Sequence, residues 1–122
     1  MEHFTLAQFA TFANPGVDSV QLLSPRNSSS RRVTITKVTV APGATQPRHS
    51  HASSEQIWYA LSGVGLLLLA DRETRMLRAG ELVRFADDEI HGVQNDGPAA
   101  FGYLSITAPP IDFSYAYAKH GA

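Results

Sequence analysis

Three histidines in this chain are spaced so that they could hold a metal ion. His49 and His51 are two residues apart, and on an extended strand such residues point to the same face. Both imidazoles could then reach one point, whereas on a helix they would diverge. About forty residues further on, His91 stands at the start of another apolar run. If the flanking chain is β structure, the pair predicts a metal site; in an exposed loop after Pro47 it would mean little.

The elements around these histidines are predicted to be strands. Turn-forming groups such as Asn14-Pro15-Gly16 recur along the chain, separated by short runs rich in Val, Ile, Thr, Leu and aromatic residues. This pattern is typical of an all-β sandwich or barrel. Only Leu6–Phe12 indicates a short helix, and the turn at Asn95–Pro98 suits a hairpin. The expected strands are Val17–Leu23, Arg32–Val40, Gln56–Leu61, Val64–Leu69, Thr74–Leu77, Leu82–Phe85, Val93–Asn95 and Ala100–Thr107.

Length and composition restrict the classes of protein that need to be considered. The 122 residues suffice for one domain spanning 1–122, and 43% hydrophobic residues suit a globular core. Ten basic against eleven acidic residues give no electrostatic case for nucleic acid or an anionic membrane. The chain has no cysteine, so a metal must be bound by nitrogen and oxygen. The longest apolar run is too short for a bilayer and no leader is evident, so we expect a cytoplasmic protein.

Two sequence motifs around the histidines resemble those of the cupin superfamily. The first, G-x5-H-x-H-x3,4-E-x6-G, is matched at Gly43, His49, His51 and Gly63; the second, G-x5-P-x-G-x2-H-x3-N, is matched at Gly80, His91 and Asn95. The resemblance implies a double-stranded β-helix, or jelly-roll barrel, with its motif core at 43–95. It also implies one divalent metal ion held by the three histidines, with Zn, Mn, Fe, Ni, Co and Cu all suited to imidazole.

This chain departs from the cupin motifs at two places. Ala86 and Asp88 replace the proline and glycine before His91, in a turn that aspartate can tolerate. Counting back from Gly63 along one strand places Gln56 at the fourth ligand position, whereas the shorter spacing after His51 would select Glu55. The two residues point to opposite faces, so only one can look into the barrel. We favour Gln56, which also occupies this position in some cupins that act on unsaturated uronates.

Other residues are weaker candidates for the pocket. Trp58 shares a strand face with Gln56 and could line a substrate cavity, and Arg84 could contact a substrate. Tyr103 and Arg48 are candidates for catalysis. Tyr103 would act as an acid or a hydrogen-bond donor, and Arg48 would contact a substrate carboxylate. The apolar and aromatic run 111–117 is expected either to cover its own barrel or to contact a second copy, and we favour a homodimer.

The resemblance leaves several functions open. A site of three neutral imidazoles and an amide leaves the +2 charge of the ion uncompensated, which favours an anionic, oxygen-rich small molecule and Lewis-acid chemistry by an isomerase, lyase or cyclase. The alternatives are a metal-dependent dioxygenase and a non-catalytic sensing cupin that binds a small molecule. A storage or structural cupin fits the small size and the intact histidine triad less well.

Overall fold

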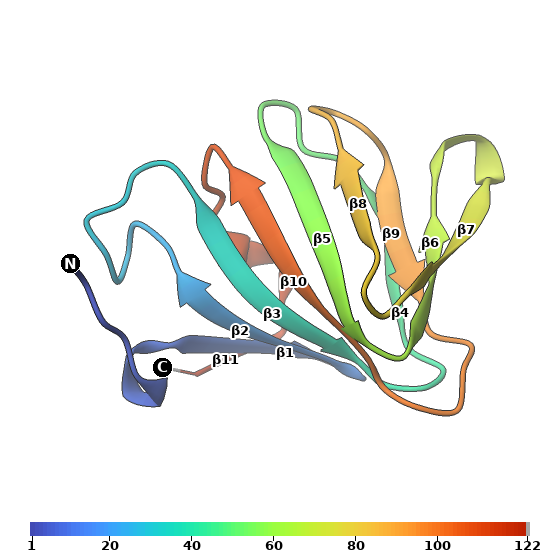
Figure 1. Cartoon of the computed structure of the whole chain (residues 1–122), viewed down its shortest axis with the longest axis horizontal. Helices are drawn as coiled ribbons and strands as arrows, with labels where there is room; N and C mark the ends of the chain where they lie inside the picture. Colours follow the sequence, from blue (N-terminus) through green and yellow to red (C-terminus); the bar gives the residue numbers. More distant parts are fainter. Residues whose placement is uncertain (122) are drawn as a thin grey trace.

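Two antiparallel sheets pack face to face in the computed structural model, which describes residues 1–121 (Figure 1). The larger sheet has the order β11-β1-β2-β3-β10-β5-β8 and the smaller one β4-β9-β6-β7. The 3-10 turn η1 (Leu6–Gln8) precedes the first strand, and η2 (Ala70–Arg72) and η3 (Phe113–Ala116) lie between later strands. The strands are β1 (Ala10–Asn14), β2 (Val17–Leu23), β3 (Thr34–Val40), β4 (Thr45–His49), β5 (Glu55–Ser62), β6 (Val64–Leu68), β7 (Thr74–Arg78), β8 (Leu82–Phe85), β9 (His91–Gln94), β10 (Phe101–Ala108) and β11 (Lys119–Gly121).

The all-β prediction is confirmed, and each expected strand is present with ends that differ by two residues or fewer. The core lies between the sheets because inward-facing side chains of both are apolar. Trp58, Phe101 and Tyr103 of the larger sheet pack in one buried cluster with Leu67 and Val93 of the smaller sheet. No helix within residues 1–121 has the length and apolar character needed to cross a membrane.

The prediction of a helix over Leu6–Phe12 is wrong beyond its first turn. A 3-10 turn ends at Gln8, and Ala10–Asn14 forms β1, which pairs along its whole length with β2. Gly16 adopts a φ of 75° in the turn between the two strands, a conformation that glycine accepts without strain. Pairing and the burial of Phe12 therefore outweigh the weak helical pattern of seven residues.

The turn at Asn95–Pro98 does not form the expected hairpin. It leads from β9 in the smaller sheet to β10 in the larger one, so its two strands pair with other partners. Asn95 is fully buried, and its side-chain amide donates to the carbonyls of Val40 and Ala99, each at 2.9 Å. Its Oδ1 accepts from the backbone N–H of Gly97. Asn95 therefore fixes the crossing between the sheets, as a structural residue.

Sequence patterns did not predict β4, the strand that carries His49. Thr45–His49 contains a proline and is mostly exposed, so it lacks the apolar alternation of a buried strand. It lies at the edge of the smaller sheet, where a proline can be accommodated because one side of the strand has no partner. Its register with β9 shifts between Gln46 and His49.

Candidate metal centre

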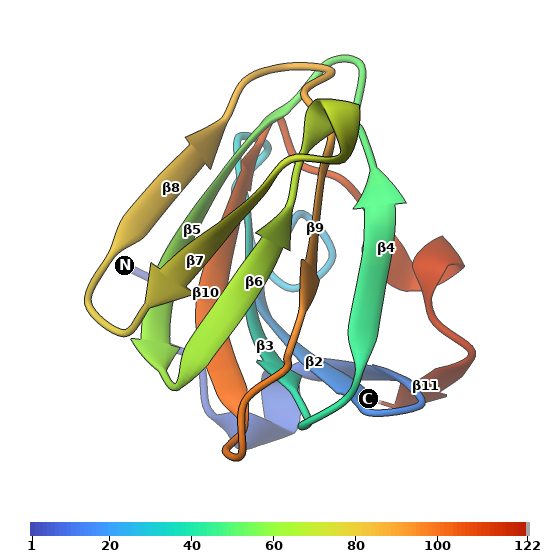
Figure 2. The same cartoon turned by 90° about the vertical axis from the view of Figure 1, so that its right-hand side faces the viewer.

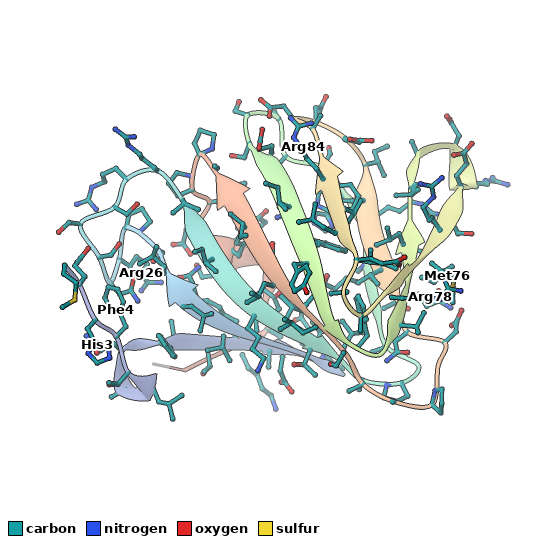
Figure 3. All side chains as sticks on the ribbon, in the orientation of Figure 1. His3, Phe4, Arg26, Met76, Arg78 and Arg84 are labelled. Carbon is teal, nitrogen blue, oxygen red and sulfur yellow. The ribbon has the colours of Figure 1, made fainter. Side chains whose placement is uncertain are left out.

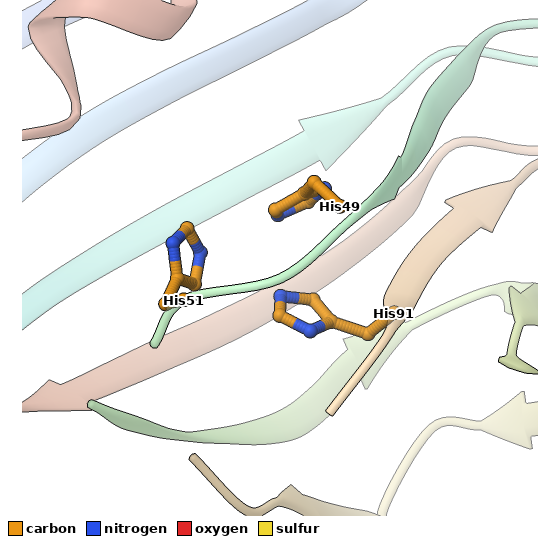
Figure 4. Close-up of side chains that lie close together, drawn as sticks. All are labelled: His49, His51 and His91. Atoms are coloured by element: carbon orange, nitrogen blue, oxygen red, sulfur yellow. The ribbon is translucent and has the colours of Figure 1, made fainter. Parts of the chain in front are cut away.

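The three predicted histidines lie close together, with their rings turned toward one another (Figure 4). His49 ends β4 and lies opposite His91, the first residue of β9, in the sheet register. Their ring centroids are 4.3 Å apart, and the ring of His51 lies 5.0 and 5.3 Å from those of His49 and His91. One nitrogen of each ring lies within 4.8 Å of the nitrogens of the other two. This group could hold one metal ion.

The route by which His51 reaches the group differs from the expectation of a shared strand face. His51 lies two residues beyond the end of β4, in the loop to β5. The loop is held by the turn before β9, where the backbone N–H of Asp88 donates to the carbonyl of His51 at 2.6 Å. Asp88 has a φ of 63°, so it adopts the left-handed conformation for which the cupin motif has glycine. The departure from the motif is thus accommodated.

Backbone carbonyls set the orientation of two of the rings. Nδ1 of His49 lies 2.8 Å from the carbonyl oxygen of Pro47, and Nδ1 of His91 lies 2.9 Å from that of Glu89. A carbonyl oxygen only accepts hydrogen bonds, so a neutral ring must carry its proton on Nδ1. Nε2 then keeps a free lone pair, which is the form of histidine that binds a metal.

The unsatisfied nitrogens of the group fit a metal ion. Nε2 of His51 and Nε2 of His91 are both buried and have no hydrogen-bond partner among the described residues. Burial lowers the pKa of His91 to about 4 and also lowers that of His51, with the nearby His49 acting in the same direction. Both rings are therefore neutral near pH 7, as metal ligands must be.

The metal-free protein is expected to lose stability as the pH falls from about 6.5 to about 4. In this range the unfolded chain protonates His91 and the folded chain does not, so protons favour unfolding. The loss reaches about 3 kcal/mol and levels off below pH 4, since one pKa unit corresponds to about 1.4 kcal/mol. Urea unfolding of chelator-treated protein at pH 4 to 7 measures the slope. An equal slope in His91→Asn would show that this histidine is not its source.

Of the two candidates for a fourth ligand, only Gln56 faces the barrel interior. Gln56 is buried and lines the central cavity, and its Oε1 accepts a hydrogen bond of 3.0 Å from the indole N–H of Trp58. Glu55 points to the outer face, where it forms an ion pair of 3.1 Å with Arg84. The role of Gln56 as a ligand stays a prediction, while Trp58 lies beside it in the cavity as expected.

The two predicted arginines are held by other contacts. Arg84 is on β8, the edge strand of the larger sheet (Figure 3), and its guanidinium pairs with Glu55, so it is not among the residues that line the cavity and its contact with a substrate stays a prediction. Arg48 lines the cavity, but its Nε donates to the carbonyl of Leu69 at 2.8 Å and a terminal nitrogen approaches that of Glu73. Arg48 thus joins β4 to the loop after β6.

Tyr103 faces the cavity and belongs to a chain of hydrogen bonds. Its hydroxyl donates to Oε1 of Gln46 at 2.7 Å, and Nε2 of Gln46 donates to the hydroxyl of Tyr117 at 3.4 Å. Tyr117 shares a further hydrogen bond of 2.7 Å with Ser19. Burial raises the pKa of Tyr103 well above its ordinary value, so the phenol remains protonated. It can donate a hydrogen bond and cannot serve as a base near pH 7.

A cavity of about 270 Å³, lined by His49 and His51, extends between the two sheets. The C-terminal segment lies beside β4 and contributes Phe113 and Tyr117 to its wall (Figure 2). Asn14 holds this segment, because its side chain donates to the carbonyl of Ala116 and accepts from the N–H of Ala118, both at 2.8 Å. Run 111–117 therefore covers its own barrel. The homodimer stays a prediction, and this run is no longer an argument for it.

Several cavity residues were not singled out from the sequence. The register of β4 shifts between Gln46 and His49. The direction of the Gln46 side chain therefore cannot be predicted by alternation from His49. Ser19 and Gln21 face inward with Val17 by simple alternation along β2. That signal was present, but polar residues usually indicate an outer face. Outside run 111–117, the missed lining residues are Phe12, Asn14, Ser19, Gln21, Thr36, Val38, Gln46, Pro47 and Ser105.

Comparisons with known proteins agree with this geometry. The model of the family described as "Cupin domain" matches residues 36–107, more than half of the chain. The germin-like protein 3-1 of rice (Oryza sativa subsp. japonica) is 29% identical over 111 residues, which cover 81% of this chain. The chain spans only about half of that relative, 49% of its length.

Two solved structures share the fold at low sequence identity. KdgF from Halomonas sp. aligns with a TM-score of 0.70 and 21% identity, covering 81% of this chain and 84% of that one. The polyketide cyclase RemF from Streptomyces resistomycificus aligns with a TM-score of 0.77 and 20% identity, covering 89% and 80%. With the family match, the two antiparallel sheets and the histidines at the motif positions, the chain belongs to the cupin family and has its double-stranded β-helix fold.

Proposed function

We propose that this cupin is a metal-dependent enzyme acting on an anionic, oxygen-rich small molecule as an isomerase, lyase or cyclase. The observation that carries the proposal is the group of three histidines, two of them with buried nitrogens that have no partner among the described residues, beside a cavity of small-molecule size. A closed structural site would not need such a cavity. His49, His51 and His91 would hold the ion, with Gln56 as the fourth ligand.

The charge of the site favours an anionic ligand. No aspartate or glutamate is among the described residues that line the cavity, so no carboxylate offsets a divalent cation. When bound, such an ion supplies Lewis-acid chemistry, polarising a carbonyl and stabilising the negative charge that develops on its oxygen. Trp58 keeps the Gln56 amide in one orientation. Tyr103 and Gln46 offer further polar groups in the cavity, and the C-terminal segment contributes Phe113 and Tyr117 to its wall.

The structural neighbours are compatible with this class of reaction. RemF is a polyketide cyclase by its name, and cyclisation of such a substrate needs a polarised carbonyl rather than a redox-active metal. The same cavity wall could serve an isomerase or a lyase that acts on a sugar acid. Ligands without charge favour a metal ion that acts as a Lewis acid in each of these reactions. The experiment below also distinguishes a dioxygenase and a non-catalytic sensor.

The test is proton NMR in D₂O with protein loaded separately with Zn²⁺, Mn²⁺, Fe²⁺ or Ni²⁺. Galacturonate, glucuronate and an unsaturated uronate from pectin are incubated with each form. We expect loss of the signal next to the carbonyl, or conversion to an isomer, with wild-type protein in its Zn²⁺ form and not with His91→Ala. Oxygen consumption with the Fe²⁺ form alone would indicate a dioxygenase. Saturable binding without turnover in every form would indicate a sensor and contradict the proposed enzyme.

A further inference from the structure

Two buried polar atoms at the wall of the cavity, on the larger sheet, have no partner among the described residues. Nε2 of Gln21 and Oγ1 of Thr36 are buried without a hydrogen bond to any described residue, and the side chains are only 3% and 6% exposed. Both residues line the cavity. A buried donor or hydroxyl left unpaired lowers stability, so unpaired groups at a cavity wall indicate a partner supplied from outside the chain.

The two residues belong to a row that crosses the sheet. Gln21 on β2 is the direct cross-strand partner of Thr36 on β3, and Thr36 is in turn opposite Ser105 on β10. Ser105 also lines the cavity and lies opposite Trp58 on β5. We call Gln21, Thr36 and Ser105 the polar row. It lies on the larger sheet, whereas His49 lies on the edge strand β4 of the smaller sheet and His91 on the neighbouring strand β9.

The chemistry of the polar row selects an uncharged oxygen. The amide nitrogen of Gln21 donates, and the hydroxyls of Thr36 and Ser105 can donate or accept. None of the three is charged, and Arg48, the one arginine or lysine among the described residues of the lining, is hydrogen-bonded to two backbone carbonyls. A carbonyl or hydroxyl oxygen satisfies these groups, whereas a carboxylate placed there would be desolvated without a countercharge.

The cavity wall between the polar row and the histidines is largely apolar. Phe12, Val38 and Trp58 line it on the larger sheet, and Phe113 and Tyr117 line it on the C-terminal segment. The ring of Phe113 lies 5.5 Å from that of His51, and the rings of Phe12 and Tyr117 stack at 5.8 Å. Flat aromatic walls bind a compact apolar or cyclic body better than a fully hydroxylated chain.

We propose that Gln21 and Thr36 form a second ligand subsite, which binds an uncharged carbonyl or hydroxyl at the far end of the substrate. The substrate class is then a compact cyclic molecule with an anionic oxygen group toward the histidines and a neutral oxygen toward the polar row. The anionic end rests on the proposed function. The neutral end rests on the buried unpaired atoms alone.

Matched probes test the subsite through Trp58, the only tryptophan in the chain and a cavity residue. Cyclohexanecarboxylate and 4-oxocyclohexanecarboxylate differ in one carbonyl, and the weak ultraviolet absorption of the ketone is corrected with the same additions to free tryptophan. Titrations monitor indole fluorescence in Zn²⁺-loaded and metal-free protein. Wild type is expected to bind the oxo probe about tenfold more tightly, since one hydrogen bond to an otherwise unpaired group is worth about that factor.

Isosteric variants show whether the preference arises at the polar row. Gln21→Leu and Thr36→Val are each expected to reduce the tenfold preference to about threefold or less, and to raise Tm by about 3 °C because an unpaired polar group is removed. Thr39→Val makes the same chemical change on β3 but points away from the cavity, so it should leave the preference unchanged. No preference in wild type, or an unchanged preference in both cavity variants, would overturn the proposal.

The outcome also separates the subsite from the metal function. If Zn²⁺ did not tighten either carboxylate, the proposed function would lose its support, while the ratio between the two probes would still report on the polar row. If neither carboxylate bound, the binding of cyclohexanone to metal-free protein would be measured to test the subsite. Binding that weakens at least threefold in Gln21→Leu supports the subsite, and binding that is absent or unchanged overturns it.

Discussion

His91→Ala is expected to lower the affinity for Zn²⁺ by about 1000-fold or more. Loss of a residue that merely orients a ligand costs about 10–100-fold, and His91 would supply a ligand nitrogen directly. That nitrogen is buried and has no hydrogen-bond partner among the described residues. Alanine offers no ligand atom in its place. Elemental analysis of untagged protein, followed by competition with a chromophoric chelator, measures the change. Wild type should hold close to one ion per chain.

Variants of the adjacent pair on β5 provide the matched control. Gln56→Ala is expected to weaken binding by about 10–100-fold, because an amide oxygen is a poorer ligand than imidazole. Glu55→Ala removes a neighbouring side chain that points outward to Arg84, so affinity should stay within about twofold. Equal losses in both variants would contradict Gln56 as the fourth ligand. A wild-type protein that cannot be loaded with any metal would instead support a metal-free, ligand-binding cupin.

Asn95→Ala is expected to lower the free energy of unfolding by about 3 kcal/mol and Tm by roughly 10 °C. The fully buried amide makes three hydrogen bonds, and its removal leaves the carbonyls of Val40 and Ala99 and the N–H of Gly97 without this partner. Each buried group left unpaired costs about 1–3 kcal/mol, partly relieved by relaxation. Urea unfolding and calorimetry at constant metal content measure both quantities.

The neighbouring Asp96 gives the control for this substitution. Asp96 is exposed and accepts only from the side chain of Gln94, so Asp96→Ala should change stability by less than about 0.5 kcal/mol. A loss of less than 1 kcal/mol in Asn95→Ala would show that the crossing between the sheets does not depend on this amide. Metal affinity should change little in either variant, because the turn lies at the opposite end of β9 from His91.

The strands and the histidines could be predicted because their signals are local. Apolar runs of the right length with turn residues at both ends gave eight strands, and motif spacing gave His49, His51 and His91 before any contact was known. The side-chain direction at Gln56 was harder to predict. Both faces of β5 carry large apolar residues: Tyr59 and Leu61 are exposed, whereas Trp58 is buried. Alternation of hydrophobicity therefore could not assign an inner face.

The remaining features depend on contacts between distant parts of the chain. Ala10–Asn14 becomes a strand because it pairs with β2 and packs Phe12 against Tyr117, more than a hundred residues away. The C-terminal segment lines the cavity through its hydrogen bonds with Asn14, which its own sequence does not reveal. The polar row is a similar case, since Gln21 and Thr36 become neighbours only when β2 and β3 pair.

The orientation of the metal-binding rings by Pro47 and Glu89 carbonyls has a consequence for how this protein can be studied and altered. A side-chain substitution leaves the peptide carbonyl in place. A deep mutational scan would therefore show little effect at Pro47 and Glu89, whose backbone carbonyls determine which ring nitrogen of the nearby histidine is protonated. In particular, the effect of a substitution at Glu89 is expected to depend on the conformation of the loop rather than on the lost charge. An ester-for-amide exchange by chemical synthesis, which weakens the acceptor without touching any side chain, would expose this dependence directly.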